Sequence, residues 1–190
     1  TIGQAFISIA FSAAILAAYS FYKSSINESL KSEWLPLARG SFYIHGISIL
    51  GIIVCMFIMI YNHYFEYQYV WQHSSKSLPT HYMISCFWEG QEGSFLLWIF
   101  WNILLGLILI KIAKKWEAPV LTIVSTIQAF LSSMIIGIYI ADIKIGTSPF
   151  VLVRNLDENI GLPWTEMENY LQIVPQFMDG RGLNPLLQNY

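Results

Sequence analysis

The chain has 190 residues, of which 55% are hydrophobic and only 12% are charged, with a mean hydropathy of +0.52 and a formal net charge of −2. A soluble domain of this length would carry roughly twice that fraction of charged residues, so the composition indicates an integral membrane protein. The sequence has no basic stripe, so nucleic acid is not an expected partner, and its two cysteines are too few to define a disulfide framework.

Four apolar windows are each long enough to cross a bilayer, which takes about 20 helical residues. They cover Gly3–Tyr22, Phe42–Tyr61, Ser94–Ile112 and Pro119–Ile140. The predicted fold is therefore all-α, a polytopic helical bundle of about four transmembrane helices. Residues 1–146 form the transmembrane region in this prediction, with a loop at 63–93, and residues 147–190 form a tail outside the membrane.

Basic residues are concentrated in two of the loops: Lys23, Lys31 and Arg39 between the first two spans, and Lys111, Lys114 and Lys115 between the last two. The loop between the middle spans holds only Lys76. Cytoplasmic loops of membrane proteins carry an excess of Lys and Arg. We therefore expect the N-terminus, the 63–93 loop and the tail to lie outside, in the periplasm if the membrane is a bacterial inner membrane.

Small residues recur at helix-packing spacing in two of the spans. They are Ala10, Ala14 and Ala18 in the first span, and Ser133, Gly137 and Ala141 in the fourth. Such stripes let helices approach closely in lipid, so they predict contact faces of the bundle. Ser41 is the predicted N-cap of the second span.

His45 is placed by this prediction in the first turn of the second span. Ionisable groups inside the membrane are candidates for function. A neutral histidine one turn from the interface can also bond water or a carbonyl, and this structural role is the preferred interpretation.

The 63–93 loop contains three histidines and six tyrosines or tryptophans: His63, His73, His81, Tyr64, Tyr67, Tyr69, Trp71, Tyr82 and Trp88. The aromatic residues fit an interfacial belt, or alternatively a platform that stacks on a flat ligand such as a porphyrin. The histidine spacing matches no recognised metal site, so solvated histidines are expected rather than iron ligands. No nucleophile triad, phosphate-binding loop or dinucleotide fingerprint is present, so no catalytic or metal residue is predicted.

Residues 88–98, WEGQEGSFLLW, place two acids and two glycines directly before an apolar run. The segment resembles the Trp-Gly-x-x-Glu-Gly-Ser-x-Leu-Leu-Trp signature of membrane-embedded cytochrome c haem lyases of the CcmF type. Glu89 stands where that family has glycine.

Two further segments resemble the same family. Residues 69–85, YVWQHSSKSLPTHYMIS, are similar to its Tyr-Val-x-x-x-Ser-x-x-x-Leu-Pro-x-x-Tyr-Lys-Ile-Ser run, with Met83 in place of lysine. Residues 179–188, DGRGLNPLLQ, are similar to its Asp-Gly-x-x-Leu-Asn-Pro-Leu-Leu-Gln segment. The three segments follow the family's order.

The resemblance implies the N-terminal membrane part of a longer haem lyase. Such enzymes receive haem from a haem chaperone and attach it to apocytochrome c through thioethers, and other cytochrome c maturation subunits are further expected partners beside the lipid bilayer. The family's Trp-Trp-x-Trp-Asp segment is absent from this chain, so the haem ligands are expected outside it and the segment alone is expected to be inactive.

If this chain contacts haem, the resemblance favours residues around a periplasmic haem entrance: Trp88, Glu89, Glu92 and Trp98, with Arg181 as a partner for a haem propionate. The alternative interpretation is a membrane transport or scaffold subunit without haem. In the tail, Thr165 and Glu168 predict a short surface helix near 165–172.

Overall fold

The structure, a computed structural model, describes residues 1–26, 29, 31–140, 143–156, 167–169 and 178–185. The helical elements are α1 (Ile2–Ile26), α2 (Lys31–Tyr61), α3 (Gln68–His73), α4 (Met83–Glu89), α5 (Gln91–Ile112) and α6 (Glu117–Ile136), with short 3-10 turns η2 (Thr80–Tyr82), η3 (Lys114–Trp116) and η4 (Val153–Asn155). Strands β1 (Ile138–Ile140) and β2 (Ile143–Ile145) form one antiparallel hairpin in the described part of the chain. The predicted tail helix near 165–172 falls mostly outside the described residues.

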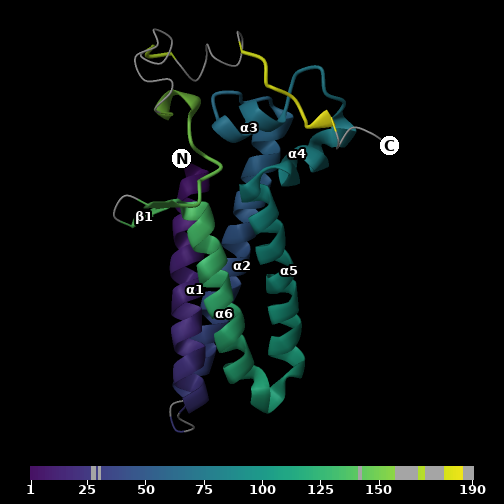
Figure 1. Cartoon of the computed structure of the whole chain (residues 1–190). Helices are drawn as coiled ribbons and strands as arrows, with labels where there is room; N and C mark the ends of the chain where they lie inside the picture. The colour runs from purple at the N-terminus through teal and green to yellow at the C-terminus, as the bar shows by residue number, and fades with distance from the viewer. Residues whose placement is uncertain (27–28, 30, 141–142, 157–166, 170–177, 186–190) are drawn as a thin grey trace. The chain divides into compact units, whose positions relative to one another are not determined.

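The all-α prediction is confirmed, with the short hairpin as an addition to the helices (Figure 1). In the described residues, four helical segments have the length and the apolar composition needed to cross a membrane: Ile2–Ile26, Lys31–Tyr61, Gln91–Ile112 and Lys114–Ile136. The protein is therefore a multi-pass membrane protein.

The chain divides into two compact units. One, the bundle unit, comprises Thr1–Ile53 and Phe95–Thr147, and the other, the outer unit, comprises Val54–Ser94 and Ser148–Tyr190. The 63–93 segment and the tail, which the sequence pattern treats as separate regions, thus belong to one compact unit.

In the bundle unit, α1 packs along α6 (Figure 1). Of the predicted stripe, Ala10 and Ala14 are 1% exposed, whereas Ala18 is only partly buried and the neighbouring Ala17 is fully buried. Small side chains at these positions allow close helix approach. The stripe predicted for the fourth span is wrong. The helix α6 ends at Ile136, and Gly137 follows with a left-handed φ of 71°, a conformation that glycine adopts at helix C-termini.

The helix α2 begins at Lys31 rather than near Phe42, so the predicted N-cap at Ser41 is also wrong. The Ser41 hydroxyl lies inside the helix and donates to the Leu37 carbonyl at 2.8 Å. Tertiary contacts explain the extension, since Ala38 is fully buried in a core cluster with residues of α1 and α6.

An ion pair links this part of α2 to the start of α6. The Arg39 guanidinium donates to both carboxylate oxygens of Glu117, at 2.6 and 2.7 Å, and the Glu117 side chain is only 6% exposed. Bidentate pairing of this kind compensates the cost of burying a carboxylate.

His45 lies deeper in α2 than predicted and is fully buried. Its Nδ1 lies 2.9 Å from the carbonyl oxygen of Ala10, a distance that is a hydrogen bond when Nδ1 carries the proton. This contact joins α2 to α1 and agrees with a structural role for His45.

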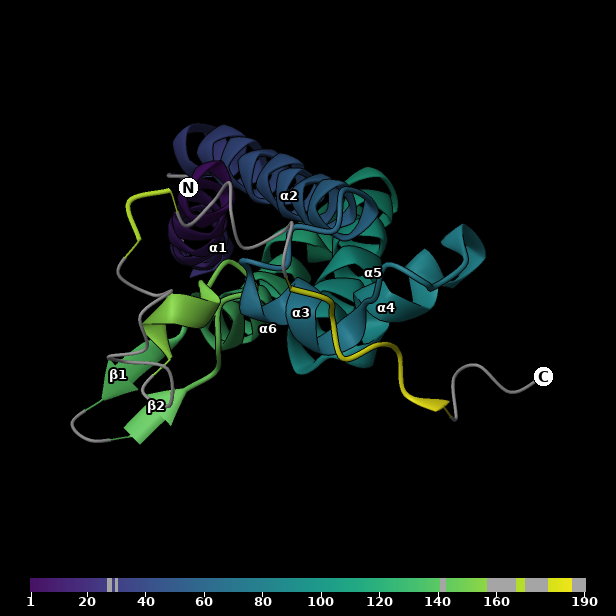
Figure 2. The same ribbon diagram turned by 90° about the horizontal axis from the view of Figure 1, so that it is seen from above.

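In the outer unit, the segment predicted as a loop contains α3, η2 and α4, which Figure 2 shows from above. The described part of the tail pairs with the start of α3: Gln68 N donates to Val151 O, and Val153 N donates to Glu66 O, both at 2.9 Å. Several apolar residues of this unit are buried: Phe65, Val70, Phe87, Phe150, Val153 and Leu183.

Candidate functional site

The WEGQEGSFLLW segment forms a junction between two helices. The helix α4 ends at Glu89, Gly90 takes an extended conformation (φ −80°, ψ 161°), and α5 starts at Gln91. A helix that stops in this way leaves its last four carbonyls without intrahelical partners. The residues that satisfy these carbonyls define the site.

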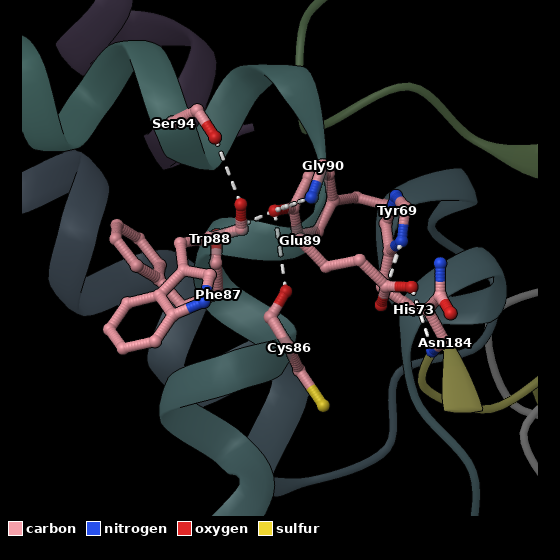
Figure 3. A network of polar contacts seen from close by, with 9 residues as sticks. All are labelled: Tyr69, His73, Cys86, Phe87, Trp88, Glu89, Gly90, Ser94 and Asn184. Carbon is pink, nitrogen blue, oxygen red and sulfur yellow. Dashed lines mark hydrogen bonds and ion pairs between the residues drawn. The ribbon is translucent and has the colours of Figure 1, made fainter. Parts of the chain in front are cut away.

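Tyr69 of α3 satisfies two of them (Figure 3). Its hydroxyl donates to the Phe87 carbonyl at 2.6 Å, with the Cys86 carbonyl 3.3 Å away, and accepts from the Gly90 N–H at 3.3 Å. The Ser94 hydroxyl donates to the Trp88 carbonyl at 2.9 Å. One buried tyrosine therefore fixes the end of α4 and the break before α5.

The junction leaves no room for a side chain at Gly93. A Cβ atom there would overlap the Phe87 carbonyl oxygen and lie 2.6 Å from the Tyr69 hydroxyl. Because the overlap is with backbone, a side-chain rotation cannot relieve it. The glycine of the signature is thus required by the close approach of α5 to the end of α4.

The Glu89 carboxylate holds two other segments against the junction (Figure 3). Its Oε1 accepts the backbone N–H of Asn184 at 2.8 Å, and its Oε2 lies 3.2 Å from Nδ1 of His73. The contact with His73 is electrostatic, because neither atom makes a hydrogen bond within the described residues. The Glu89 and His73 side chains are only 14% and 19% exposed.

Burial dominates the electrostatics of this site. It lowers the pKa of His73, and the neighbouring Glu89 carboxylate opposes that shift. Burial also raises the pKa of Tyr69 above its usual range, with the charge of Glu92 adding to the shift. Tyr69 therefore remains protonated and keeps its role as a hydrogen-bond donor.

The segment 179–184 packs along α3 by backbone contacts. Arg181 N donates to Trp71 O at 2.7 Å, Gly182 N donates to Ser74 O at 3.0 Å, and Lys76 N donates to a carboxylate oxygen of Asp179 at 2.9 Å. The Arg181 guanidinium carbon lies 4.2 Å from the centre of the Trp71 ring. In this cation–π pair Arg181 is exposed and Trp71 is partly buried.

The structure brings some of the predicted site residues together and leaves others apart. Glu89 and the segment carrying Arg181 meet through Asn184. Trp88 is 42% exposed, and its indole points away from the Glu89 carboxylate (Figure 3). Glu92 lies in the first turn of α5, close enough to influence Tyr69. Trp98 belongs to the bundle unit, where it is 60% exposed and contacts Phe95 edge-on.

Sequence reasoning missed Tyr69, His73 and Asn184 as members of this site. The sequence pattern groups Tyr69 with the aromatic residues of an interfacial belt, and His73 with solvated histidines. The sequence does hint at two of these residues, because Tyr69 begins one of the segments that resemble the haem lyase family and Asn184 lies in another. Their contacts with the third segment depend on tertiary structure.

The histidines of the 63–93 segment each lie against another side chain. His73 faces Glu89 and its ring lies 4.7 Å from that of Tyr69. The ring of His81 lies 4.2 Å from that of Tyr82, and His63 stacks on Phe65. No group of three metal-ligating side chains occurs in the part of the chain that the structure describes.

The fold and the site define a multi-pass membrane protein with a helical outer unit built around a helix–helix junction. The chain is similar to the cytochrome c-type biogenesis protein CcmF of Haemophilus influenzae, with 25% identity over 163 residues. The similarity covers 85% of this chain and 22% of that protein, so the chain spans about a fifth of its relative. No protein-family profile and no solved structure matches the chain.

Replacement of Gly93 by alanine is expected to destabilise the protein by about 2 kcal/mol or more, because the added Cβ overlaps backbone. Gly40→Ala is the matched control, since Gly40 lies inside α2 and a Cβ added there would have nothing within 4 Å. Alanine there should be neutral or stabilising by up to about 1 kcal/mol. Thermal unfolding in detergent compares the two variants, and equal melting temperatures would contradict this account of the junction.

Acidification is expected to weaken the outer unit through His73. Because burial lowers the folded-state pKa of His73, the unfolded chain binds more protons just below its own pKa of about 6.5. The stability that neutral His73 contributes to the folded protein is therefore complete above that pH and is lost as the pH falls below it. His73→Gln should show a smaller fall in melting temperature between pH 7.5 and pH 5.5 than the wild type. A pH dependence in His73→Gln that is the same as in the wild type would refute the assignment.

Proposed function

We propose that the chain is the N-terminal membrane part of a cytochrome c haem lyase and takes part in covalent haem attachment to apocytochrome c. The supporting observation is that the three segments resembling this family contact one another. Tyr69 binds the end of α4, Glu89 binds the backbone of Asn184, and Ser74 binds Gly182. The similarity to a cytochrome c-type biogenesis protein supports the same function.

In this proposal the outer unit positions partners, and the haem ligands lie elsewhere in the longer protein. The exposed indole of Trp88 and the Arg181–Trp71 pair provide the surface on which the haem chaperone or apocytochrome c docks. Glu89 and Tyr69 act behind this surface, because their polar groups hold the helix junction in place. Glu92 follows in the first turn of α5. Aromatic and arginine side chains are the usual anchors of protein interfaces.

Haem would supply the reactive vinyl groups for thioether formation, and orientation of haem and the cytochrome thiols is the catalyst's main contribution. Residues of this chain would contribute peripheral contacts only, with Arg181 suited to a propionate. The segment alone is therefore not expected to attach haem.

The alternative is a membrane transport or scaffold subunit without haem. The exposed tryptophans and the apolar spans are compatible with it. The motif contacts favour the haem lyase, since a transporter gives no reason for the three segments to be joined.

The proposed orientation places residues 63–93 and the N-terminus in the periplasm of a bacterial inner membrane. In a cysteine-free background, Ser77→Cys should react with a membrane-impermeant maleimide added to intact cells, whereas Ser29→Cys should react only after the cells are opened. Both serines are exposed in the structure. Labelling of Ser29→Cys in intact cells would overturn the orientation.

The docking surface is tested by cytochrome c maturation in cells that carry the variants in the complete protein. Trp88→Ala and Arg181→Ala should each reduce the yield of holocytochrome by about tenfold, which corresponds to about 1.4 kcal/mol of lost interaction. The level of the membrane protein should stay unchanged, because both side chains are exposed.

Trp101→Ala is the matched control, since Trp101 is 60% exposed but lies in the bundle unit. It should leave maturation at the wild-type level. Parallel losses of holocytochrome and of membrane protein in Trp88→Ala would indicate a purely structural role. Full maturation in both variants would favour the alternative function.

A further inference from the structure

A groove of about 270 Å³ lies between α2 and α5 in the bundle unit. Every residue that lines it is apolar or aromatic, among them Phe42, Ile47 and Leu50 of α2 and Phe100, Leu104 and Leu107 of α5. Phe42 is fully buried at its floor, whereas Ile47 and Leu50 at its rim are 66% and 49% exposed. The groove therefore opens sideways, toward the lipid around the two spans, and the function proposed above does not use it.

The stripe of α5 that lines the groove continues into a positive charge. Leu104 and Leu107 line the groove, and Lys111 comes four residues after Leu107 in the last turn of the helix. Residues at this spacing lie on one face of a helix, so Lys111 lies about one turn, roughly 5 Å, beyond the apolar end of the groove. Lys111 ends an apolar span and the exposed Trp116 follows it, which places this end of the groove at the membrane–water interface.

No acid compensates the charge at this end of the groove. Lys111 and Lys114 are exposed, and neither forms an ion pair among the residues that the structure describes. The acid that follows in the sequence is Glu117, and Arg39 binds both of its carboxylate oxygens. Glu33 in the first turn of α2 makes no ion pair with these lysines within the described residues. An anion is therefore favoured beside Lys111.

The two features together select one kind of ligand. A groove along the span suits an acyl chain, and a cation at the level of the lipid headgroups suits a phosphate, so an anionic phospholipid satisfies both. Basic sites beside transmembrane helices bind anionic headgroups in this way. An apolar transmembrane helix of a partner would cover the groove, but it would leave the charge of Lys111 unused.

We propose that the groove binds one acyl chain of an anionic phospholipid whose phosphate group lies beside Lys111. Phe42 and Leu104 contact the chain, Lys111 pairs with the phosphate, and the neighbouring Lys114 adds to the positive potential. Inorganic phosphate shares the charge of the headgroup, but only the lipid also fills the groove.

Native mass spectrometry of the complete protein that contains this sequence, purified in detergent, tests the proposal with phosphatidylglycerol and with phosphatidylcholine of identical acyl chains. Phosphatidylglycerol should bind at least about fivefold more tightly to the wild type. Lys111→Gln should reduce this preference by about fivefold, the contribution of one lysine near an anionic headgroup. Leu104→Phe fills the groove and should weaken the binding of both lipids by about tenfold, the effect of displacing about two methylene groups.

Each variant has a matched control. Lys115→Gln removes the same charge from the same turn, but Lys115 lines a different cavity, with Ser24 and Pro119. Leu105→Phe makes the same change one residue along α5, at a side chain that is 49% exposed and lies outside the groove. Both controls should bind the two lipids as the wild type does.

Equal affinity of the wild type for the two lipids, equal losses in Lys111→Gln and Lys115→Gln, or unchanged lipid binding in Leu104→Phe would each overturn the proposal. Displacement of phosphatidylglycerol by millimolar inorganic phosphate would overturn lipid as the ligand. Lipid selectivity is the measurement because a lysine at a helix C-terminus also stabilises the helix itself. Melting temperatures confirm that each variant is folded, and Ile47→Phe at the exposed rim fills the groove if Leu104→Phe does not fold.

Discussion

The hydroxyl of Tyr69 is the interaction on which the outer unit depends. A helix that stops at Glu89 and restarts at Gln91 exposes carbonyls that must find donors, and Tyr69 provides one donor between two of them. Because the same oxygen also accepts from Gly90, it fixes both sides of the break. The tyrosine lies on α3, so the position of α3 and the direction of the α4–α5 junction are set together.

Glu89 extends this junction to a distant part of the chain. Its carboxylate accepts the backbone N–H of Asn184 and approaches the imidazole of His73, so one side chain connects α4, α3 and the tail. The haem lyase signature that this segment resembles has glycine at the position of Glu89. A glycine could not make the contacts by which the Glu89 carboxylate supports the proposed docking surface.

The positions of the four spans could be predicted from the sequence, because the cost of placing charge in a bilayer leaves long apolar windows. Helix ends were less predictable. The early start of α2 depends on Ala38 packing against α1 and α6 and on the Arg39–Glu117 pair. The helix α6 ends early because Gly137 takes a left-handed conformation. The spacing of apolar residues in the sequence does not predict this backbone conformation.

The sequence by itself determined the membrane class, the approximate spans and the three segments that resemble one family, since each of these follows from composition or from local order of residues. Tertiary structure alone decided which polar groups meet. Tyr69, Glu89 and Asn184 are far apart along the chain, and no spacing rule relates them. Their pairing follows from the requirement that buried donors and acceptors be satisfied, which only the packed outer unit can fulfil.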